Sequence, residues 1–298
     1  MSSEPTRPIL PPDAEHAELY QRVREAIHAL PGYFKTSTYI EGISATDIFT
    51  LNTALGATIE SQVVNTLNLM RPVWDPNEKY ISYSFVRQSQ TFPDVLLKSA
   101  VPNRMDIILG IELKGWYLLA KEAAPSFRFQ VTPSACANQD VIVVVPWALS
   151  NVISGSPVVF APYVESARYA AEYRNYHWQH LRQTASNISI IQPVNISPYP
   201  KKSAQIADKP TSDNGGNFGR FARTGLMDEY LSQTKGIPIS GISAQNWLDF
   251  FKIFQDQKPP DQIHIEILRL RNKLVKVSSE LSPIEIILEQ LEKLILDY

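Results

Sequence analysis

The sequence predicts a mixed α/β (α+β) protein, with a mixed central β-sheet flanked by helices and a mostly helical C-terminal portion. Segments rich in β-branched and aromatic residues follow one another between residues 79 and 145, separated by Pro, Asn and Ser, as strands do. Helical periodicity precedes these segments and dominates again after residue 225. Helices on both sides of a run of strands are typical of an α/β core.

The N-terminal elements are helical. Residues 1–12 are interpreted as a flexible lead-in, and residues 13–30 place apolar side chains along one stripe of a helix. A capping box at residues 44–47 predicts the start of a long helix through Met70, where Pro72 is expected to end it.

The remaining elements follow in chain order. The expected strands cover residues 79–88, 92–97, 106–116, 127–132 and 140–145. A helix is expected over residues 163–183, and residues 13–195 together form the expected core domain. Residues 196–225 predict a basic loop rich in Gly and Pro. The helical portion, residues 226–298, belongs to the same domain or forms a separate one, and its helices are expected at 226–234, 243–255, 261–278 and 282–297.

Composition excludes several classes of protein. The 298 residues carry a net charge of −2, so any surface that binds nucleic acid must be local. The single cysteine, Cys136, excludes an internal disulfide and is typical of a reducing cytoplasm. No apolar run reaches the roughly 18 residues of a membrane span, and the N-terminus lacks the apolar core of a secretory signal.

Four charged residues interrupt an apolar stretch between residues 91 and 116: Asp94, Asp106, Glu112 and Lys114. Side chains alternate along a strand, so Glu112 and Lys114 share one face. Asp106 lies on the same face but about 20 Å away, which is too far to share an ion with Glu112. A second carboxylate must therefore come from another segment.

Asp94 is the candidate for this second carboxylate. If residues 92–97 and 106–116 form an antiparallel hairpin around Pro102, Asp94 falls opposite Ile111 or Glu112. Opposed carboxylates repel, and a divalent cation would remove that penalty. Two carboxylates with open coordination positions suit Mg²⁺, while Lys114 would orient or deprotonate a water or stabilise a phosphate.

The alternative is that Glu112 and Lys114 form an exposed ion pair on a half-solvated strand. The apolar residues 107–111 and the following Gly115 and Trp116 favour burial instead. The sequence therefore predicts a metal site.

These residues resemble a known motif. Pro93-Asp94, a gap of 17 residues and then Glu112-Leu113-Lys114 resemble the PD-(D/E)xK nuclease superfamily, and the strand leading into Gly115 resembles that of type II restriction endonucleases. With the neighbouring elements, the similar region covers about residues 44–146.

The resemblance implies a Mg²⁺-dependent site-specific endonuclease that acts on double-stranded DNA, often as a homodimer, in the cytoplasm of a bacterial or archaeal cell. It implies catalytic roles for Asp94, Glu112 and Lys114, with Asp94 and Glu112 as metal ligands. A helix-borne glutamate often joins such sites, and Glu60 is the best match because it shares a helix face with Val63. The alternative for Glu60 is a place at the edge of the apolar stripe.

DNA recognition requires contacts to phosphates and to base edges. The candidates near the motif are Arg87, Gln88, Gln90, Lys121 and Arg128. Arg220 and Arg223 are the candidates in the glycine-rich segment 214–225, where glycine permits close backbone approach. The alternatives are solvated side chains at strand ends and a flexible surface loop.

Other chemistries find little support in the sequence. No G-x-x-x-x-G-K-[ST] loop is present, so no nucleotide cofactor is expected. His177 and His180 lack accompanying Cys or His ligands for zinc. Two other functions stay open: a repair or modification-dependent nuclease of the same superfamily, and a non-catalytic DNA-binding protein.

Overall fold

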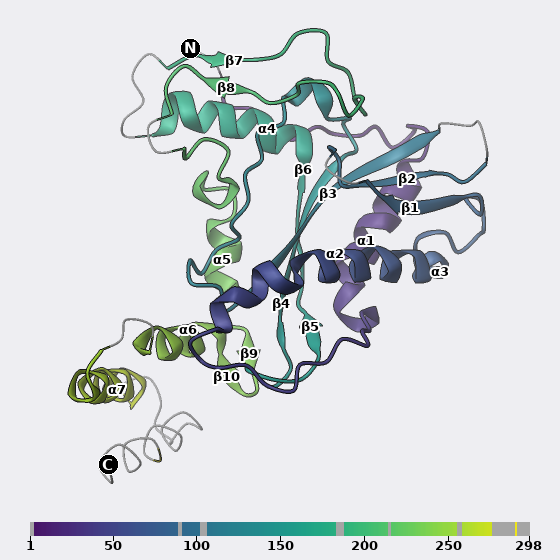
Figure 1. Cartoon of the computed structure of the whole chain (residues 1–298). Coiled ribbons are helices and arrows are strands. Elements are labelled where there is room, and N and C mark those ends of the chain that lie inside the picture. Colours follow the sequence, from purple (N-terminus) through teal and green to yellow (C-terminus); the bar gives the residue numbers. More distant parts are fainter. Residues whose placement is uncertain are drawn as a thin grey trace.

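A six-stranded mixed β-sheet forms the centre of the molecule, with helices packed around it (Figure 1). The computed structural model describes residues 3–88, 91–101, 106–182, 188–213, 216–254, 258–275 and 290, with the backbone alone for 273–275. The strands of this sheet are β1 (Tyr83–Arg87), β2 (Val95–Ser99), β3 (Ile107–Tyr117), β4 (Val141–Leu149), β5 (Pro157–Val159) and β6 (Tyr163–Ser166). The prediction of a mixed α+β class is confirmed.

The helices lie before, between and after these strands. They are α1 (Ala17–Tyr33), α2 (Leu51–Leu69), α3 (Arg71–Trp74), α4 (Ala167–Tyr176), α5 (Asp228–Thr234), α6 (Ala244–Ile253) and α7 (Pro260–Val275), and a π-helical turn, η3 (His177–Leu181), continues α4. Two short hairpins join β7 (Ile190–Ile191) to β8 (Lys209–Pro210) and β9 (Pro238–Ile239) to β10 (Ile242–Ser243). None of the helices in the described residues is long and apolar enough to cross a membrane.

The sheet changes direction at β3. Strands β1, β2 and β3 pair antiparallel, whereas β3 pairs in parallel with β4, and β5 and β6 both pair antiparallel with β4. Pairing between β2 and β3 ends at Ile111, and the pairing of β3 with β4 begins at that residue. From Ile111 onward, the part of the chain that the structure describes places a strand on one side of β3 only.

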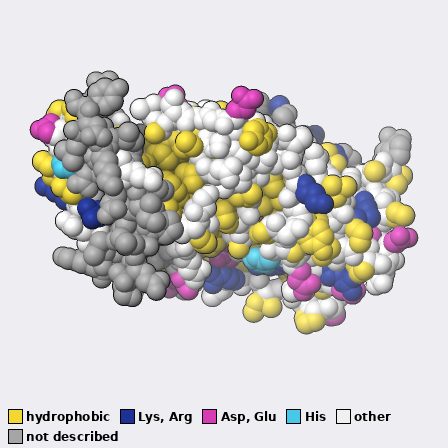
Figure 2. All heavy atoms as spheres, turned by 90° about the horizontal axis from the view of Figure 1, so that it is seen from below, with side chains coloured by type: hydrophobic (Ala, Val, Ile, Leu, Met, Phe, Trp, Pro, Cys, Tyr) yellow, Lys and Arg dark blue, Asp and Glu magenta, His cyan; other side chains and the backbone are white. Residues whose placement is uncertain are grey.

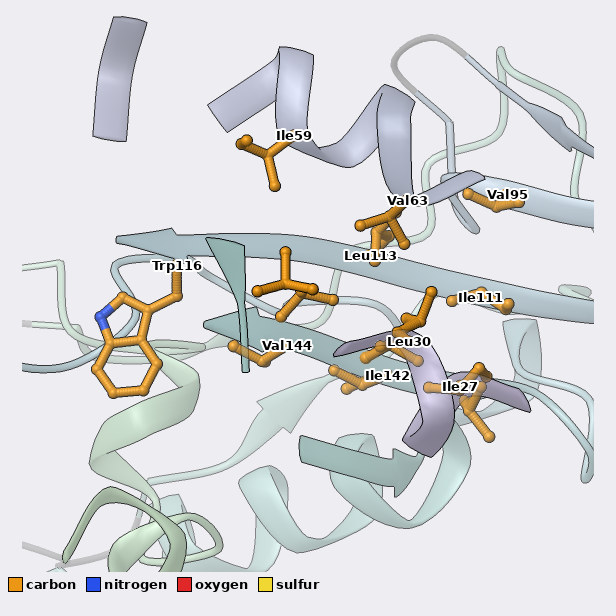
Figure 3. Close-up of a cluster of buried hydrophobic side chains, with 14 of the residues drawn as sticks. Ile27, Leu30, Ile59, Val63, Val95, Ile111, Leu113, Trp116, Ile142 and Val144 are labelled. Atoms are coloured by element: carbon orange, nitrogen blue, oxygen red, sulfur yellow. The ribbon is translucent and has the colours of Figure 1, made fainter. Parts of the chain in front are cut away.

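Apolar side chains of α1 and α2 meet the sheet in the main core. Figure 3 shows Ile59 and Val63 of α2 pointing towards β3, with Val63 beside Leu113, and Leu30 of α1 beside Ile142 of β4. All of β4 is buried, as expected for a strand covered on both faces.

Several expected boundaries are wrong, for local reasons. Residues 127–132 are not a strand, because they face an irregular segment and make only isolated bridges, at Arg128 and Val131. The helix expected at residue 163 begins at Ala167, where the side chain of Ser166 accepts the Tyr169 N–H, because the first four residues pair with β4 as β6.

Two other boundaries differ at the ends of α2. Pro72 does not stop helical structure, since it occupies the first turn of α3, where proline is tolerated. The capping box at residues 44–47 is not formed, and α2 begins at Leu51 after a 3₁₀ turn, η1 (Ile48–Thr50).

The basic segment 196–225 packs along residues 129–132. The Phe129 N–H donates to Gly219 O at 2.7 Å, and Asp208 N–H donates to Gln130 O at 2.8 Å. Gly219 has a φ of +79°, and a Cβ there would lie 2.6 Å from Gln130 Cγ, so only glycine permits this approach.

A buried ion pair holds the same segment against α4. The Arg174 guanidinium, 2% exposed, lies 2.5 Å from Asp208 and donates to the carbonyl oxygens of Phe129 and Val131. Burial lowers the pKa of Arg174 to about 10, against the opposing effect of Asp208.

The C-terminal portion packs on the sheet as far as α6, since Met227, Ile239 and Phe251 belong to the main core. Helix α7 instead packs on α6 through a second, smaller cluster, to which Ile267 contributes. Figure 1 shows α7 at one end of the molecule, away from the sheet.

Candidate active site

The register of the β2–β3 hairpin brings Asp94 to Glu112. Val95 pairs with Ile111, so Asp94, one residue before β2, lies opposite Glu112 on the next strand. The expected antiparallel hairpin is confirmed, and of the two expected positions for Asp94, opposite Ile111 or opposite Glu112, the register gives the second. The expected turn at Pro102 lies outside the described residues.

Glycine makes room for the segment that carries Asp94. A Cβ on Gly110 would lie 2.5 Å from Pro93 Cγ and 2.8 Å from Asp140 Oδ1, so Pro93 can pack against β3 only because residue 110 is glycine. On the other side, the Gln88 side chain donates to Pro93 O at 2.9 Å, and the Gln88 N–H donates to Asp94 O at 2.6 Å. The backbone at Asp94 is therefore held from both sides.

Three side chains accept hydrogen bonds along the open edge of β3. The bonds join Leu113 N–H to Asp94 Oδ2 (3.1 Å), Gly115 N–H to Glu60 Oε1 (3.1 Å) and Tyr117 N–H to Asn52 Oδ1 (3.0 Å). Buried N–H groups need acceptors, so these bonds satisfy the edge that β2 leaves uncovered. They also fix two carboxylates beside Glu112 and Lys114.

Glu60 lies between two cations. Its Oε1 atom is 3.4 Å from Lys114 Nζ, and its Oε2 atom is 3.4 Å from Arg87 Nη2. Arg87 also donates to Ala57 O at 3.3 Å. The structure thus brings Glu60 to β3, the strand that carries Glu112 and Lys114, as the resemblance implies. Arg87, for which the sequence suggested a contact to DNA, is paired with the Glu60 carboxylate.

Glu112 has the carboxyl group whose pKa is raised most in the cluster. Burial, and next the charge of Asp94, raise the pKa of Glu112 well above its ordinary value. Its Oε2 atom is buried and has no hydrogen-bond partner among the described residues. Burial likewise raises the pKa of Asp94 to about 6, opposed by the Leu113 N–H bond and by the charges of Arg87 and Lys114.

These features fit a divalent cation. A buried carboxylate oxygen without a donor has a free coordination position, and two opposed carboxylates are stable as anions only beside positive charge. In the described residues, no three His, Cys, Asp or Glu side chains are already gathered as a metal site. Mg²⁺ needs no such cage, since it is commonly held by one or two carboxylates and keeps several waters.

The other candidate residues lie in two places. Lys121 is exposed in the turns after β3, and no contact joins it to the carboxylates in the described structure; Gln90 lies outside the described residues. Arg128 and Arg220 pair through a backbone bridge, and Arg220 and Arg223 line one pocket with Arg128. The structure thus brings three of the DNA-binding candidates together.

Aromatic contacts connect these arginines to the motif. The ring of Phe92, two residues before Asp94, lies 5.9 Å from the ring of Phe129, which in turn contacts Phe221. On the face shown in Figure 2, Lys and Arg side chains are spread over the surface, and some of them lie next to Asp or Glu.

Sequence reasoning missed two features of the site. Asn52 lies eight residues before Glu60, about two helical turns away, so the shared face of α2 was a usable signal. The pairing of Arg87 with Glu60 joins residues 27 apart and had no signal in the sequence.

No protein-family model, no curated protein and no solved structure matches this chain. Its function must be argued from the site itself.

Proposed function

We propose that this protein is a Mg²⁺-dependent endonuclease that hydrolyses phosphodiester bonds in double-stranded DNA, as a type II restriction enzyme with a restriction-endonuclease-like core. The observation that carries the proposal is the buried Glu112 Oε2 atom, without a partner in the described structure, opposite Asp94. Lys114 completes the motif on the same strand, two residues further on.

Each side chain of the proposed site has a separate role. Asp94 and Glu112 would hold Mg²⁺, which supplies positive charge to the phosphate and makes a water easier to deprotonate. Lys114, with 31% of its side chain exposed, reaches solvent and donates to the attacking water or to a phosphate oxygen. Glu60 orients the Lys114 ammonium from 3.4 Å away.

A cleavage assay tests the proposal directly. Phage DNA is incubated with the protein, with and without Mg²⁺, and the products are separated on an agarose gel. We expect discrete fragments only with Mg²⁺, and at least a roughly 100-fold lower rate for Glu112→Gln and for Lys114→Ala. Glu41→Gln, an exposed change outside the site, is the control and should cut normally. Metal-dependent cutting that survives in Glu112→Gln would exclude the proposed site.

A non-catalytic DNA-binding protein is the second candidate, because the carboxylates of Asp94 and Glu60 already serve as acceptors for the β3 edge. This function predicts DNA binding without cleavage, unchanged by Glu112→Gln. A repair or modification-dependent nuclease would use the same residues, and it would cut methylated or damaged DNA while leaving plain unmethylated plasmid intact.

A further inference from the structure

A second polar site lies between η3 and the loop at residues 217–224. This pocket, of about 250 Å³, is lined by four arginines, by His177, Trp178, Asn217, Gly219 and Thr224, and by no Asp or Glu of the described structure. The four are Arg174, Arg182, Arg220 and Arg223, and we call this site the arginine pocket.

Two of the four arginines have a carboxylate partner, and one of these pairings is long. Arg174 is neutralised by Asp208, but the Glu122 carboxylate is 3.8 Å from Arg220 Nη1, which is a weak pairing. The side chain of Arg223 donates to the neutral Asn217 Oδ1 at 2.7 Å. Like charges gathered in one pocket repel one another, and an anion bound between them would reduce this repulsion.

Two of the arginines are positioned for an oxyanion. The Arg220 Nε atom is buried and has no acceptor in the part of the chain that the structure describes, which is unfavourable for a donor group. The Arg182 guanidinium lies 3.4 Å above the centre of the Trp178 ring, and this contact holds its plane in place. A planar guanidinium in a fixed position binds phosphate oxygens through paired N–H bonds.

The pKa of His177 also responds to the positive charge of the arginine pocket. Burial first, and then the charge of Arg182, lower the pKa of His177, while Asp228 opposes them. The neutral imidazole adds a hydrogen-bonding group without further repulsion between cations.

We propose that the arginine pocket is a phosphate-binding site, distinct from the carboxylates at Asp94 and Glu112. The phosphate comes either from a DNA backbone or from a small phosphorylated molecule. That the phosphate belongs to DNA rests on the proposed function, whereas phosphate binding by the arginine pocket does not.

The fold connects the pocket to the motif strand. Gly219, which lines the pocket, accepts the Phe129 N–H, and the Phe129 ring contacts Phe92 beside the Asp94 segment. A duplex that reached the carboxylates would therefore have basic side chains on the same supporting structure, which favours the DNA source.

The test uses the whole protein and two binding measurements that need no cleavage. The first is thermal unfolding in inorganic phosphate against chloride at equal ionic strength. The second is fluorescence anisotropy with a labelled duplex in EDTA, over a range of salt concentrations. Arg223→Gln and Arg182→Gln remove one charge each from the pocket, and Arg269→Gln, an exposed change on α7, is the matched control.

We expect Arg223→Gln to weaken duplex binding about tenfold and to lower the salt slope by about 1, the value of one phosphate contact. Arg269→Gln should match the unmodified protein. A response confined to the inorganic phosphate measurement would identify a small phosphorylated ligand instead. If neither pocket variant differs from Arg269→Gln in either measurement, the proposal is overturned. If the unmodified protein cuts no DNA but Arg223→Gln weakens phosphate binding, the nuclease proposal is refuted and the phosphate-site proposal is supported.

Discussion

Asp94 and Glu112 place two carboxylates where little water reaches them, and this arrangement lowers stability unless a cation is present. Burial raises both pKa values, so each carboxyl group is more easily protonated in the folded protein than in the unfolded chain. The same desolvation that destabilises two anions increases their attraction for a divalent ion. Stability in metal-free solution and affinity for Mg²⁺ should therefore change in opposite directions when either charge is removed.

This reasoning predicts a pH dependence for the metal-free protein. The pKa of Asp94 rises from 3.8 in the unfolded chain to about 6 in the folded protein, so the folded state holds more protons in this interval. Its contribution to stability is present below pH 4 and is lost as the pH rises through 6, on the order of 1–3 kcal/mol. Thermal unfolding in EDTA between pH 4 and 8 measures it, and Mg²⁺ should restore part of the loss at pH 7.5.

The control for this prediction is the double variant Asp94→Asn/Glu112→Gln. It should show a smaller decline between pH 4 and 6 and no stabilisation by Mg²⁺, while Asp47→Asn, an exposed change, should behave like the unmodified protein. A double variant that declines as steeply as the unmodified protein would mean that these carboxylates do not titrate as described.

At the level of elements, the sequence predicts what depends on local rules. The alternation of strand side chains and one antiparallel hairpin suffice to place Asp94 opposite Glu112, and helical periodicity suffices to turn Glu60 toward the sheet. Contacts between segments distant in sequence could not be predicted. The arginine pocket joins Arg182 to Arg223 across 41 residues, and the buried pair of Arg174 and Asp208 spans 34.

The failed prediction at residues 127–132 has the same origin. Their composition is that of a strand, but their partner is the segment around Ala207 and Gly219, which is too irregular to form a continuous ladder. Strand propensity measures how well side chains pack on a pleated surface, so it cannot specify whether a neighbouring strand exists.

The buried ion pair that attaches the basic segment to α4 predicts how stability changes when the pair is broken. Arg174→Ala leaves Asp208 buried without its partner, which should lower the free energy of unfolding by about 3–5 kcal/mol. Arg168→Ala, on the same helix, breaks a partly exposed pair with Glu172 and an exposed hydrogen bond to Asn138, and it should cost about 1 kcal/mol. Urea unfolding of both variants measures the difference. Equal losses would show that the buried pair does not hold the segment.

In the whole molecule, the number of proposed sites per chain differs from the number of bonds that a double-strand break requires. The proposal assigns one pair of metal ligands to each chain, whereas a double-strand break requires hydrolysis of two phosphodiester bonds. Two chains related by a two-fold axis present their sites to the two strands of a symmetric sequence. The homodimer is therefore part of the proposal, and it can be tested through the products of cleavage.

Mixing active and inactive chains provides that test. In a dimer formed from one unmodified chain and one Glu112→Gln chain, one strand should be cut and the other left intact, because only one of the two proposed sites would hold its metal. Supercoiled plasmid should then accumulate as the nicked circle, and its share should follow the statistical fraction of mixed dimers. Mixing unmodified chains with Glu41→Gln chains should give linear product only. Linear product without nicked circles in the Glu112→Gln mixture, at a rate proportional to the unmodified chain, would show that each chain cuts both strands by itself.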